Sequence, residues 1–232
     1  MSPRQLTTGL DVPLYPVGLV VAGRPCLVVG GGAIAARKIL ALLHCQAAVT
    51  VVAPEVRTAL AILAAQSRPN ANQSPPLDVQ LRPYRPGEAA GYRLVITATG
   101  VPDVDRAVHD DAEAAGVWVN SADDLDNCTF LLPSVHRDGP VTVSVATGGT
   151  SPALATWLRR RIATTVGPGL AALAGLLAEA RHDLRQRGRS TEHVDWAALL
   201  DGPLPDLVRQ GRLHDARHLL AHALDSTRGL DE

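Results

Sequence analysis

Aromatic side chains are scarce in this sequence: they make up 3% of its 232 residues, with a single phenylalanine. A hydrophobic core must therefore consist of valine, leucine, isoleucine and alanine, and the apolar share of 46% is large enough to build one. An excess of positive charge is also missing, because the formal net charge is −1, which argues against a nucleic-acid partner. No apolar run approaches the ~18 residues of a membrane-spanning helix, so we expect no membrane partner.

The sequence has only three cysteines, Cys26, Cys45 and Cys128, which lie far apart. An odd and widely spaced set predicts free thiols in a reducing compartment rather than a disulfide framework or a zinc site. The first residues lack the long apolar core of a secretory signal. We therefore expect a cytoplasmic protein with no resident metal.

A run of glycines directly after an apolar stretch is the most informative feature that is present. Its pattern, Gly30-x-Gly32-x-x-Ala35, is the Gly/Ala-ending form of the dinucleotide fingerprint. Gly30 allows a tight turn from strand to helix, Gly32 lets backbone approach a pyrophosphate, and Ala35 lets the helix pack closely on the strand. The free N–H groups of the helix N-terminus would face the phosphates. The alternative is a purely structural turn.

The surrounding pattern is that of an α/β fold. We expect strands at residues 26–29, 48–52, 79–82, 94–98 and 117–119, and helices at 33–43, 56–66 and 103–115. Such alternation predicts a parallel Rossmann-type sheet in the order 3-2-1-4-5 that ends near residue 120. The polar, proline-rich residues 67–76 predict a surface loop.

The second half of the chain has a different pattern. Two strands are predicted at residues 129–132 and 141–145, around a turn at 137–140. Ser151 as N-cap and Pro152 at the first helical position predict a helix to about residue 164. From Pro168 onward the sequence predicts helices, broken at residue 188, at residues 202–203 and at residue 211.

The end of the second strand lacks the acidic residue that usually binds the ribose hydroxyls. This chain has Ala53, Pro54 and Glu55 there, so the acid stands two places late. Either Glu55 reaches the ribose from the following turn, or the backbone of Ala53 and Pro54 takes that role. No arginine follows directly, which favours NAD over NADP.

Three carboxylates, Asp123, Asp124 and Asp126, follow the last predicted strand of the sheet. They are placed to act as base, metal ligand or loop cap, and capping is the commonest role of aspartate in turns.

A second glycine turn, with Thr147, Gly148, Gly149 and Ser151, leads into the predicted helix. It is either an anion site or simply a capped helix start.

Two further groups are charged. His214, His218 and His222 share one helix face opposite an apolar one, which favours a solvated face over a metal site. Basic residues occur in two segments, which we call together the basic stretch: His136, Arg137, Arg159, Arg160 and Arg161. The basic stretch either attracts an acidic substrate or is solvated.

Taken together, these motifs resemble the precorrin-2 dehydrogenase family, whose fold also forms the N-terminal half of siroheme synthase. The matching segments are residues 13–15, 28–32, 36–38, 51–55, 94–99, 119–123, 128–130 and 147–152. The Arg37-Lys38 pair and the Gly-Gly-Thr-Ser-Pro element are the most specific of them. Ala53-Pro54-Glu55 is normal for this family.

The resemblance implies NAD-dependent oxidation of precorrin-2 to sirohydrochlorin. The cofactor would lie over Gly30, Gly32, Ala33 and Ile34, with Pro54 and Glu55 at its ribose. Asp123 matches the catalytic aspartate and would accept a proton. Thr147, Gly148, Gly149 and Ser151 would bind substrate, and Thr147 stands where some members carry a serine that can be phosphorylated. The basic stretch would face the many substrate carboxylates.

The resemblance also implies a homodimer and a stand-alone dehydrogenase. We expect an NAD-binding Rossmann domain at residues 1–120, a small α+β dimerisation and active-site segment at 121–165, and a helical region at 166–232. One alternative is an enzyme that also inserts iron as a ferrochelatase. Another is a non-catalytic NAD-sensing or scaffold module.

Overall fold

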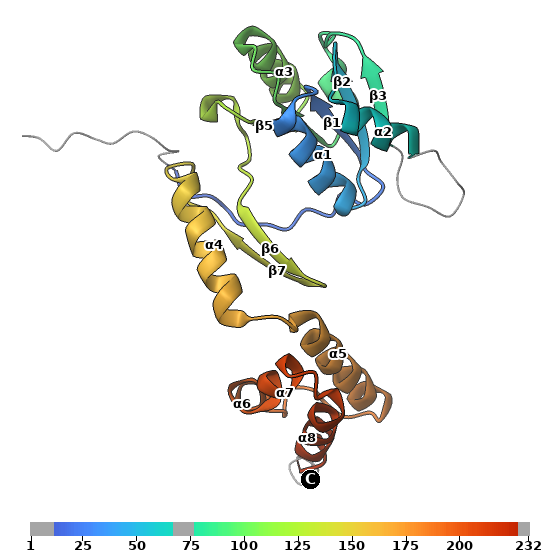
Figure 1. Ribbon diagram of the computed structural model, residues 1–232, viewed down its shortest axis with the longest axis vertical. Helices are drawn as coiled ribbons and strands as arrows, with labels where there is room; N and C mark the ends of the chain where they lie inside the picture. Colours follow the sequence, from blue (N-terminus) through green and yellow to red (C-terminus); the bar gives the residue numbers. More distant parts are fainter. Residues whose placement is uncertain (1–11, 67–76, 227–232) are drawn as a thin grey trace, which may run out of the picture. The chain divides into compact units, whose positions relative to one another are not determined.

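A five-stranded parallel sheet organises the first part of the chain in the computed structural model, which describes residues 12–66 and 77–226 (Figure 1). Its strands are β1 (Pro25–Val29), β2 (Ala48–Ala53), β3 (Leu77–Leu81), β4 (Leu94–Thr97) and β5 (Trp118–Ser121). They lie in the order β3-β2-β1-β4-β5, and every neighbouring pair is parallel. The predicted Rossmann order is confirmed, while the predicted loop at 67–76 lies outside the described residues.

Helices cover both faces of this sheet. They are α1 (Ala33–His44), α2 (Thr58–Gln66) and α3 (Pro102–Ala114), with the short 3₁₀ helices η1 (Glu88–Gly91) and η2 (Leu125–Asn127). Each predicted helix is present, although α2 begins at Thr58 rather than at residue 56.

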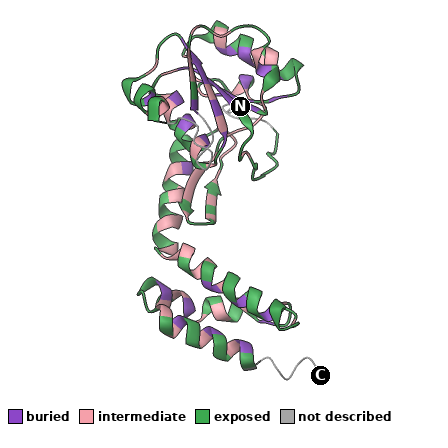
Figure 2. Ribbon diagram, turned by 90° about the vertical axis from the view of Figure 1, so that its right-hand side faces the viewer, coloured by how far each residue is buried: buried purple, intermediate pink, exposed green. Residues whose placement is uncertain are grey.

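Two aliphatic clusters, one on each face, hold the helices to the sheet. Along β1 the side chains alternate: Val28 belongs to a cluster with Ile39 of α1, and Leu27 to a cluster with Val108 of α3. All four side chains are fully buried, and the sheet is the most buried part of its unit (Figure 2). Burial on both faces explains why β1 reads as a continuous apolar run rather than an alternating one.

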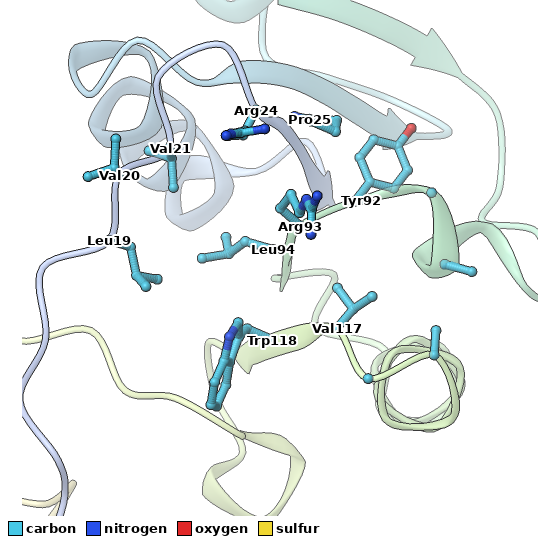
Figure 3. Close-up of a pocket in the computed structure, with 14 residues that line it drawn as sticks. Leu19, Val20, Val21, Arg24, Pro25, Tyr92, Arg93, Leu94, Val117 and Trp118 are labelled. Atoms are coloured by element: carbon cyan, nitrogen blue, oxygen red, sulfur yellow. The ribbon is translucent and has the colours of Figure 1, made fainter.

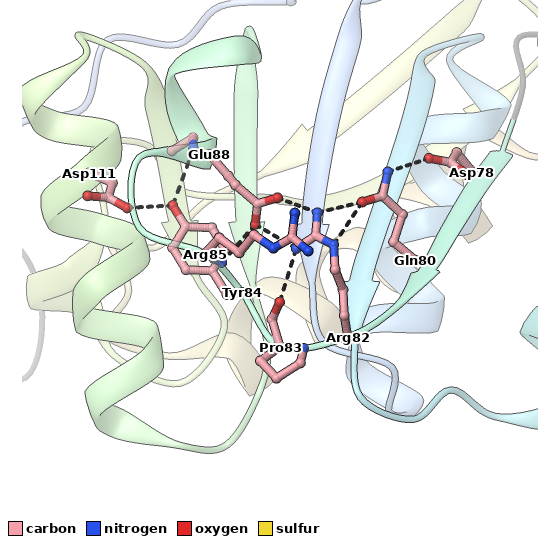
Figure 4. A network of polar contacts seen from close by, with 9 residues as sticks. Asp78, Gln80, Arg82, Pro83, Tyr84, Arg85, Glu88 and Asp111 are labelled. Carbon is pink, nitrogen blue, oxygen red and sulfur yellow. Dashed lines mark hydrogen bonds and ion pairs between the residues drawn. The ribbon is translucent and has the colours of Figure 1, made fainter.

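A polar network fastens the segment after β3 to α3 (Figure 4). The Tyr84 hydroxyl donates to Asp111 of α3 at 2.8 Å and accepts the N–H of Ala89 at 3.2 Å. Burial, and then the hydrogen bond to Asp111, raise the pKa of Tyr84, so its hydroxyl stays protonated and keeps donating. Arg82 and Glu88 form an ion pair in the same segment.

The predicted strand at residues 129–132 is wrong. Thr129 is instead hydrogen-bonded to β5. Its N–H donates to the Val119 carbonyl, and its hydroxyl accepts a hydrogen bond from the Val119 N–H, both at 2.8 Å. The hairpin consists of β6 (Ser134–Asp138) and β7 (Val141–Val145). The tight turn sets this register: Asp138 pairs with Val141, with Gly139 in the left-handed region between them.

The helix α4 (Pro152–Val166) packs on this hairpin. As predicted, Ser151 caps it by accepting the N–H of Leu154 at 3.2 Å, and Pro152 is its first residue. Asp138 then accepts the N–H groups of Gly169 and Leu170 at 3.1 and 2.8 Å, where the next helix begins.

Four more helices follow, and their apolar faces form a third cluster. They are α5 (Leu170–Gln186), α6 (Trp196–Asp201), α7 (Leu204–Arg209) and α8 (Leu213–Ser226), separated near the predicted breaks. On α8, Leu220 and Leu224 are buried, while His214, His218 and His222 are exposed. The predicted exposed histidine face is confirmed.

The described chain divides into two compact units. The first consists of the residues up to Leu132 together with Gly148–Thr150, and the second of Pro133–Thr147 and the residues from Ser151 onward. The finer division at residues 120 and 165 stays a prediction. Within 12–66 and 77–226, no single helix is long and apolar enough to cross a membrane; α4 and α5 meet that test only jointly, across a 60° bend.

Replacing Tyr84 with phenylalanine tests the polar network. The Ala89 N–H, on a fully buried residue, would lose its hydrogen-bond acceptor. We expect Tyr84→Phe to lower the free energy of unfolding by about 1–2 kcal/mol in urea titrations. Tyr92→Phe is the matched control, since Tyr92 packs on the same cluster but its hydroxyl has no hydrogen bond among the residues described. Equal losses in both variants would contradict the role assigned to the hydroxyl.

Candidate functional site

The carboxyl ends of β1, β2 and β4 meet at the glycine turn, where ligands of such sheets bind. Gly30 follows β1 with a φ of +126°, and its N–H donates to the Val52 carbonyl at 2.9 Å. A Cβ at Gly30 would lie 2.8 Å from the Ala98 carbonyl carbon. The turn therefore packs closely between the ends of β2 and β4, and only glycine fits at position 30.

The next two glycines differ in their surroundings. A Cβ at Gly31 would collide with the Glu55 carbonyl and lie 2.8 Å from the Val56 Cα, and the Gly31 carbonyl accepts the Arg57 N–H at 3.1 Å. A Cβ at Gly32 would have no heavy atom within 4 Å. Gly31 thus allows the loop after β2 to pack closely against the glycine turn. Sequence reasoning missed this role, although the run of three glycines signals it. Gly32 leaves an open space on the edge.

The first turn of α1 borders this open space. Gly32 is its N-cap and supplies no side-chain cap, and the first turn has no acidic residue. The leading N–H groups of a helix have no partner within the helix, so those near Ala33 and Ile34 are available to an anion. Ala35 is fully buried against the sheet, as the fingerprint requires. These residues fit a pyrophosphate.

Pro54 and Glu55 are exposed directly after β2. The contact of the Glu55 carbonyl with Gly31 brings this turn to the same edge as the fingerprint. The Glu55 carboxylate makes no hydrogen bond or ion pair within the described residues. It is therefore free to accept hydrogen bonds from hydroxyl groups of a ligand.

A buried carboxylate that sequence reasoning missed orders the segment after β4. Asp105 of α3 is 7% exposed and accepts hydrogen bonds from both the Thr97 and the Thr99 hydroxyls, the latter at 2.8 Å. The Thr-x-Thr sequence followed by an aspartate in the first turn of a helix is the signal that could have found it. Through Thr97 and Thr99, Asp105 holds the backbone at Ala98 that touches Gly30.

The acidic loop after β5 is organised by a thiol. The Cys128 sulfur accepts the Ser121 N–H at 3.2 Å and lies 3.3 Å from the carbonyl oxygens of Ser121 and Asp124. Burial raises the pKa of this thiol, so it remains a neutral group inside the loop. The Asn120 amide, also buried, donates to the Phe130 carbonyl at 3.0 Å and closes the loop.

The three aspartates of this loop have different surroundings. Asp124 accepts the Asp126 N–H and the Asn127 amide, both at 3.0 Å, so it is a loop cap. Asp123 and Asp126 are exposed, and their carboxylates make no hydrogen bond or ion pair among the residues described. Of the three, Asp123 stands closest to the end of β5.

Lys38 is a second residue that sequence reasoning did not place at the site. It is half-buried on α1, next to the buried Ile39. Burial lowers the pKa of its ammonium and neighbouring Arg37 adds to this, whereas Cys128 and Asp123 act in the opposite direction. A partly desolvated ammonium therefore lies within electrostatic range of the acidic loop.

The second glycine turn spans residues of both units. Within the second unit, the Thr147 hydroxyl donates to the Ser151 carbonyl at 3.0 Å and accepts the Ser151 N–H at 3.2 Å. Within the first unit, Gly149 lies against Leu125, where a Cβ would come within 2.7 Å of the leucine Cδ1. Gly148 and Gly149 both have positive φ, so the turn requires glycines.

The basic stretch is only partly available to a substrate. Arg159 donates to the Ser134 hydroxyl at 3.1 Å, and the Arg161 guanidinium lies 5.8 Å from the Trp157 ring centroid. Arg160 and Arg137 are exposed. The structure therefore gives Arg159 a role in joining α4 to the hairpin.

An open glycine turn, an uncapped helix N-terminus and the ends of parallel strands together define a nucleotide-binding protein of the Rossmann class. Residues 17–134, just over half of the chain, match the family model described as "Putative NAD(P)-binding". The chain belongs to this NAD(P)-binding family. Residues 138–165 match a second model, "Sirohaem biosynthesis protein central".

Curated relatives share the sequence over most of this chain. It is 37% identical over 214 residues to the siroheme synthase of Nitrosomonas europaea and 36% identical over 214 residues to that of Methylococcus capsulatus. Each alignment covers 91% of this chain but only 44% and 43% of the relative, so the chain spans less than half the length of these proteins.

A solved structure titled "SirC, precorrin-2 dehydrogenase" has a similar fold. Its TM-score is 0.69 at 24% sequence identity, and the match covers 91% of this chain and all of that one. The resemblance that the motifs indicate is confirmed by these matches in sequence and in fold.

Alanine substitutions at two adjacent glycines separate folding from cofactor binding. Gly31→Ala forces a clash with backbone, so we expect it to lower the free energy of unfolding by about 1–3 kcal/mol. Gly32→Ala should lower it by only about 0.5–1 kcal/mol, because alanine is a poorer N-cap than glycine, but should weaken NAD binding at least about tenfold, since its methyl group occupies the open space. Chemical unfolding and calorimetric NAD titration provide the two measurements. Unchanged NAD affinity in Gly32→Ala would show that the dinucleotide lies elsewhere.

Proposed function

We propose that this chain oxidises precorrin-2 to sirohydrochlorin with NAD as the hydride acceptor. The observation that carries the proposal is the pairing, in one chain, of a dinucleotide-binding edge with a segment at residues 138–165 that matches a sirohaem biosynthesis model. The siroheme synthases to which the chain is similar support the same substrate. The three free cysteines favour a reducing, cytoplasmic location.

In this proposal the cofactor is held at the carboxyl edge of the sheet, where the carboxyl ends of β1, β2 and β4 meet. The N–H groups at Gly32, Ala33 and Ile34 bind the pyrophosphate, and Pro54 and Glu55 border the ribose. The exposed Glu55 carboxylate accepts hydrogen bonds from the ribose hydroxyls but repels a 2′-phosphate, which supports NAD over NADP. When bound, the nicotinamide supplies the redox chemistry by accepting a hydride.

Asp123 is the proton acceptor in this proposal. Its carboxylate is exposed and has no partner among the described residues, so it is available to a substrate C–H or N–H group. Lys38 places a positive charge within range of the same loop, where the acidic side chains of the substrate would be attracted. The hydroxyls and N–H groups of Thr147, Gly148, Gly149 and Ser151 bind further substrate carboxylates.

Substitution of two exposed aspartates in one loop tests the catalytic role. We expect Asp123→Asn to lower turnover by about 100-fold or more, because the proton acceptor is lost. NAD affinity should not change. Asp126→Asn is the matched control, since Asp126 is also exposed and has no side-chain partner among the described residues. Absorbance changes of precorrin-2 with NAD give the rate. Full activity of Asp123→Asn would remove this residue from the mechanism.

The same assay decides among the activities considered. Sirohydrochlorin formed by the wild-type protein supports the dehydrogenase. Faster insertion of cobalt or iron into sirohydrochlorin with protein than without would add a chelatase activity. Tight NAD binding without turnover of precorrin-2 would favour a sensing or scaffold module and overturn the proposed function.

We also propose that the chain forms a homodimer through α4. Leu154 and Trp157 lie one helical turn apart on this helix and are 46% and 56% exposed. Large exposed apolar side chains on a helix are typical of a protein–protein interface, and a two-fold dimer would bury both copies together.

A charge placed on this face tests the dimer. Trp157→Glu would bring a carboxylate into the apolar contact, so we expect it to convert a dimer into a monomer in sedimentation at micromolar concentration. Ile62→Glu is the control, because Ile62 is 53% exposed on α2 in the first unit. A wild-type protein that sediments only as a monomer would rule out the proposed dimer.

A further inference from the structure

A groove lies at the amino ends of β1, β4 and β5, at the opposite edge of the sheet from the glycine turn (Figure 3). Its volume is about 600 Å³, within the range of small-molecule sites in proteins. The five residues of β1 separate the two edges by roughly 16 Å. The groove is therefore distinct from the edge proposed to hold the dinucleotide.

Two arginines give the groove a positive charge. Arg24 precedes β1 and Arg93 precedes β4, and the residues that line the groove include no carboxylate. Neither guanidinium makes a hydrogen bond or ion pair within residues 12–66 and 77–226. The carboxyl end of α3 lies beside them at Gly116, but a helix end has a charge of only about −0.5, which offsets a fraction of two cations.

Apolar side chains form the remaining wall of the groove. Trp118 at the start of β5 is 54% exposed, and Leu19 and Val20 on the opposite side are 49% and 86% exposed. In Figure 3 the Trp118 ring stands between Leu19 and Val117, below the two arginines. An exposed tryptophan near two guanidinium groups that have no partner in the described part of the chain is an arrangement that recognises flat, negatively charged molecules.

We infer that this groove is a second ligand site, which binds a small organic anion with a flat apolar ring. Its acidic group pairs with Arg24 and Arg93, and its ring lies against Trp118 and Leu19. The inference does not depend on the proposed dehydrogenase activity, because every residue involved lies at the other edge of the sheet.

A titration of the ¹⁵N-labelled full chain with 2-naphthoate tests the site. The chain has three tryptophans, and Trp118→Phe identifies which indole N–H signal belongs to Trp118. We expect 2-naphthoate to shift this signal in a saturable way while those of Trp157 and Trp196 stay in place. The uncharged analogue 2-naphthylmethanol should bind at least about tenfold more weakly, because it cannot pair with the guanidinium groups.

Two arginine variants and one control complete the experiment. Arg24→Gln and Arg93→Gln should each weaken 2-naphthoate binding about tenfold, whereas Arg106→Gln, an exposed arginine on α3 outside the groove, should not. Preserved dispersion of the remaining signals shows that the variants fold. A shift of Trp118 that fails to saturate, equal binding by both arginine variants and wild type, or displacement of 2-naphthoate by NAD would each overturn the inference.

Discussion

The close approach of Gly30 to the ends of β2 and β4, the strands on either side of β1, is the contact on which the carboxyl edge of the sheet depends. Its N–H bonds to Val52 of β2, and its α-carbon leaves no room for a side chain beside Ala98 after β4. Because the turn is held from both sides, α1 begins at a defined place, with its free N–H groups at the open space near Gly32. Gly31 then seats the loop after β2. The close backbone contacts of these glycines thus position the helix N-terminus whose N–H groups are available to an anion.

The aliphatic core explains why chemistry is confined to the edges. With almost no aromatic side chains, both faces of the sheet are filled mainly by branched aliphatic residues such as Val28 and Leu27. Three of the buried polar residues lie at strand ends, Thr97 at the end of β4 and Asn120 and Ser121 at the end of β5; Asp105 on α3 and Asn127 on η2 are the others among the described residues. The Thr97 and Asn120 side chains and the Ser121 N–H all make hydrogen bonds there, so the edge is both polar and ordered.

Charge at the carboxyl edge is kept at a cost in folding free energy. A half-buried ammonium at Lys38 is less well solvated than in water, which its lowered pKa reflects. Asp105 is a buried carboxylate that folding must supply with hydrogen bonds, and Thr97 and Thr99 provide them. Residues that burial disfavours but that persist beside a ligand edge are typical of functional sites.

The sequence by itself determined the helices, the glycine turn and the capped start of α4, because each depends on local periodicity or on one backbone requirement. The strand order was predictable because alternating strands and helices with right-handed crossovers leave few topologies. It misplaced the strand at residues 129–132, since whether Thr129 pairs with β5 or with a hairpin depends on a distant partner. The electrostatic influence of Asp123 on Lys38 and the shared groove of Arg24 and Arg93 likewise join residues that are far apart along the chain. Only the tertiary structure decided these pairings, because burial and electrostatic range are properties of distances in space.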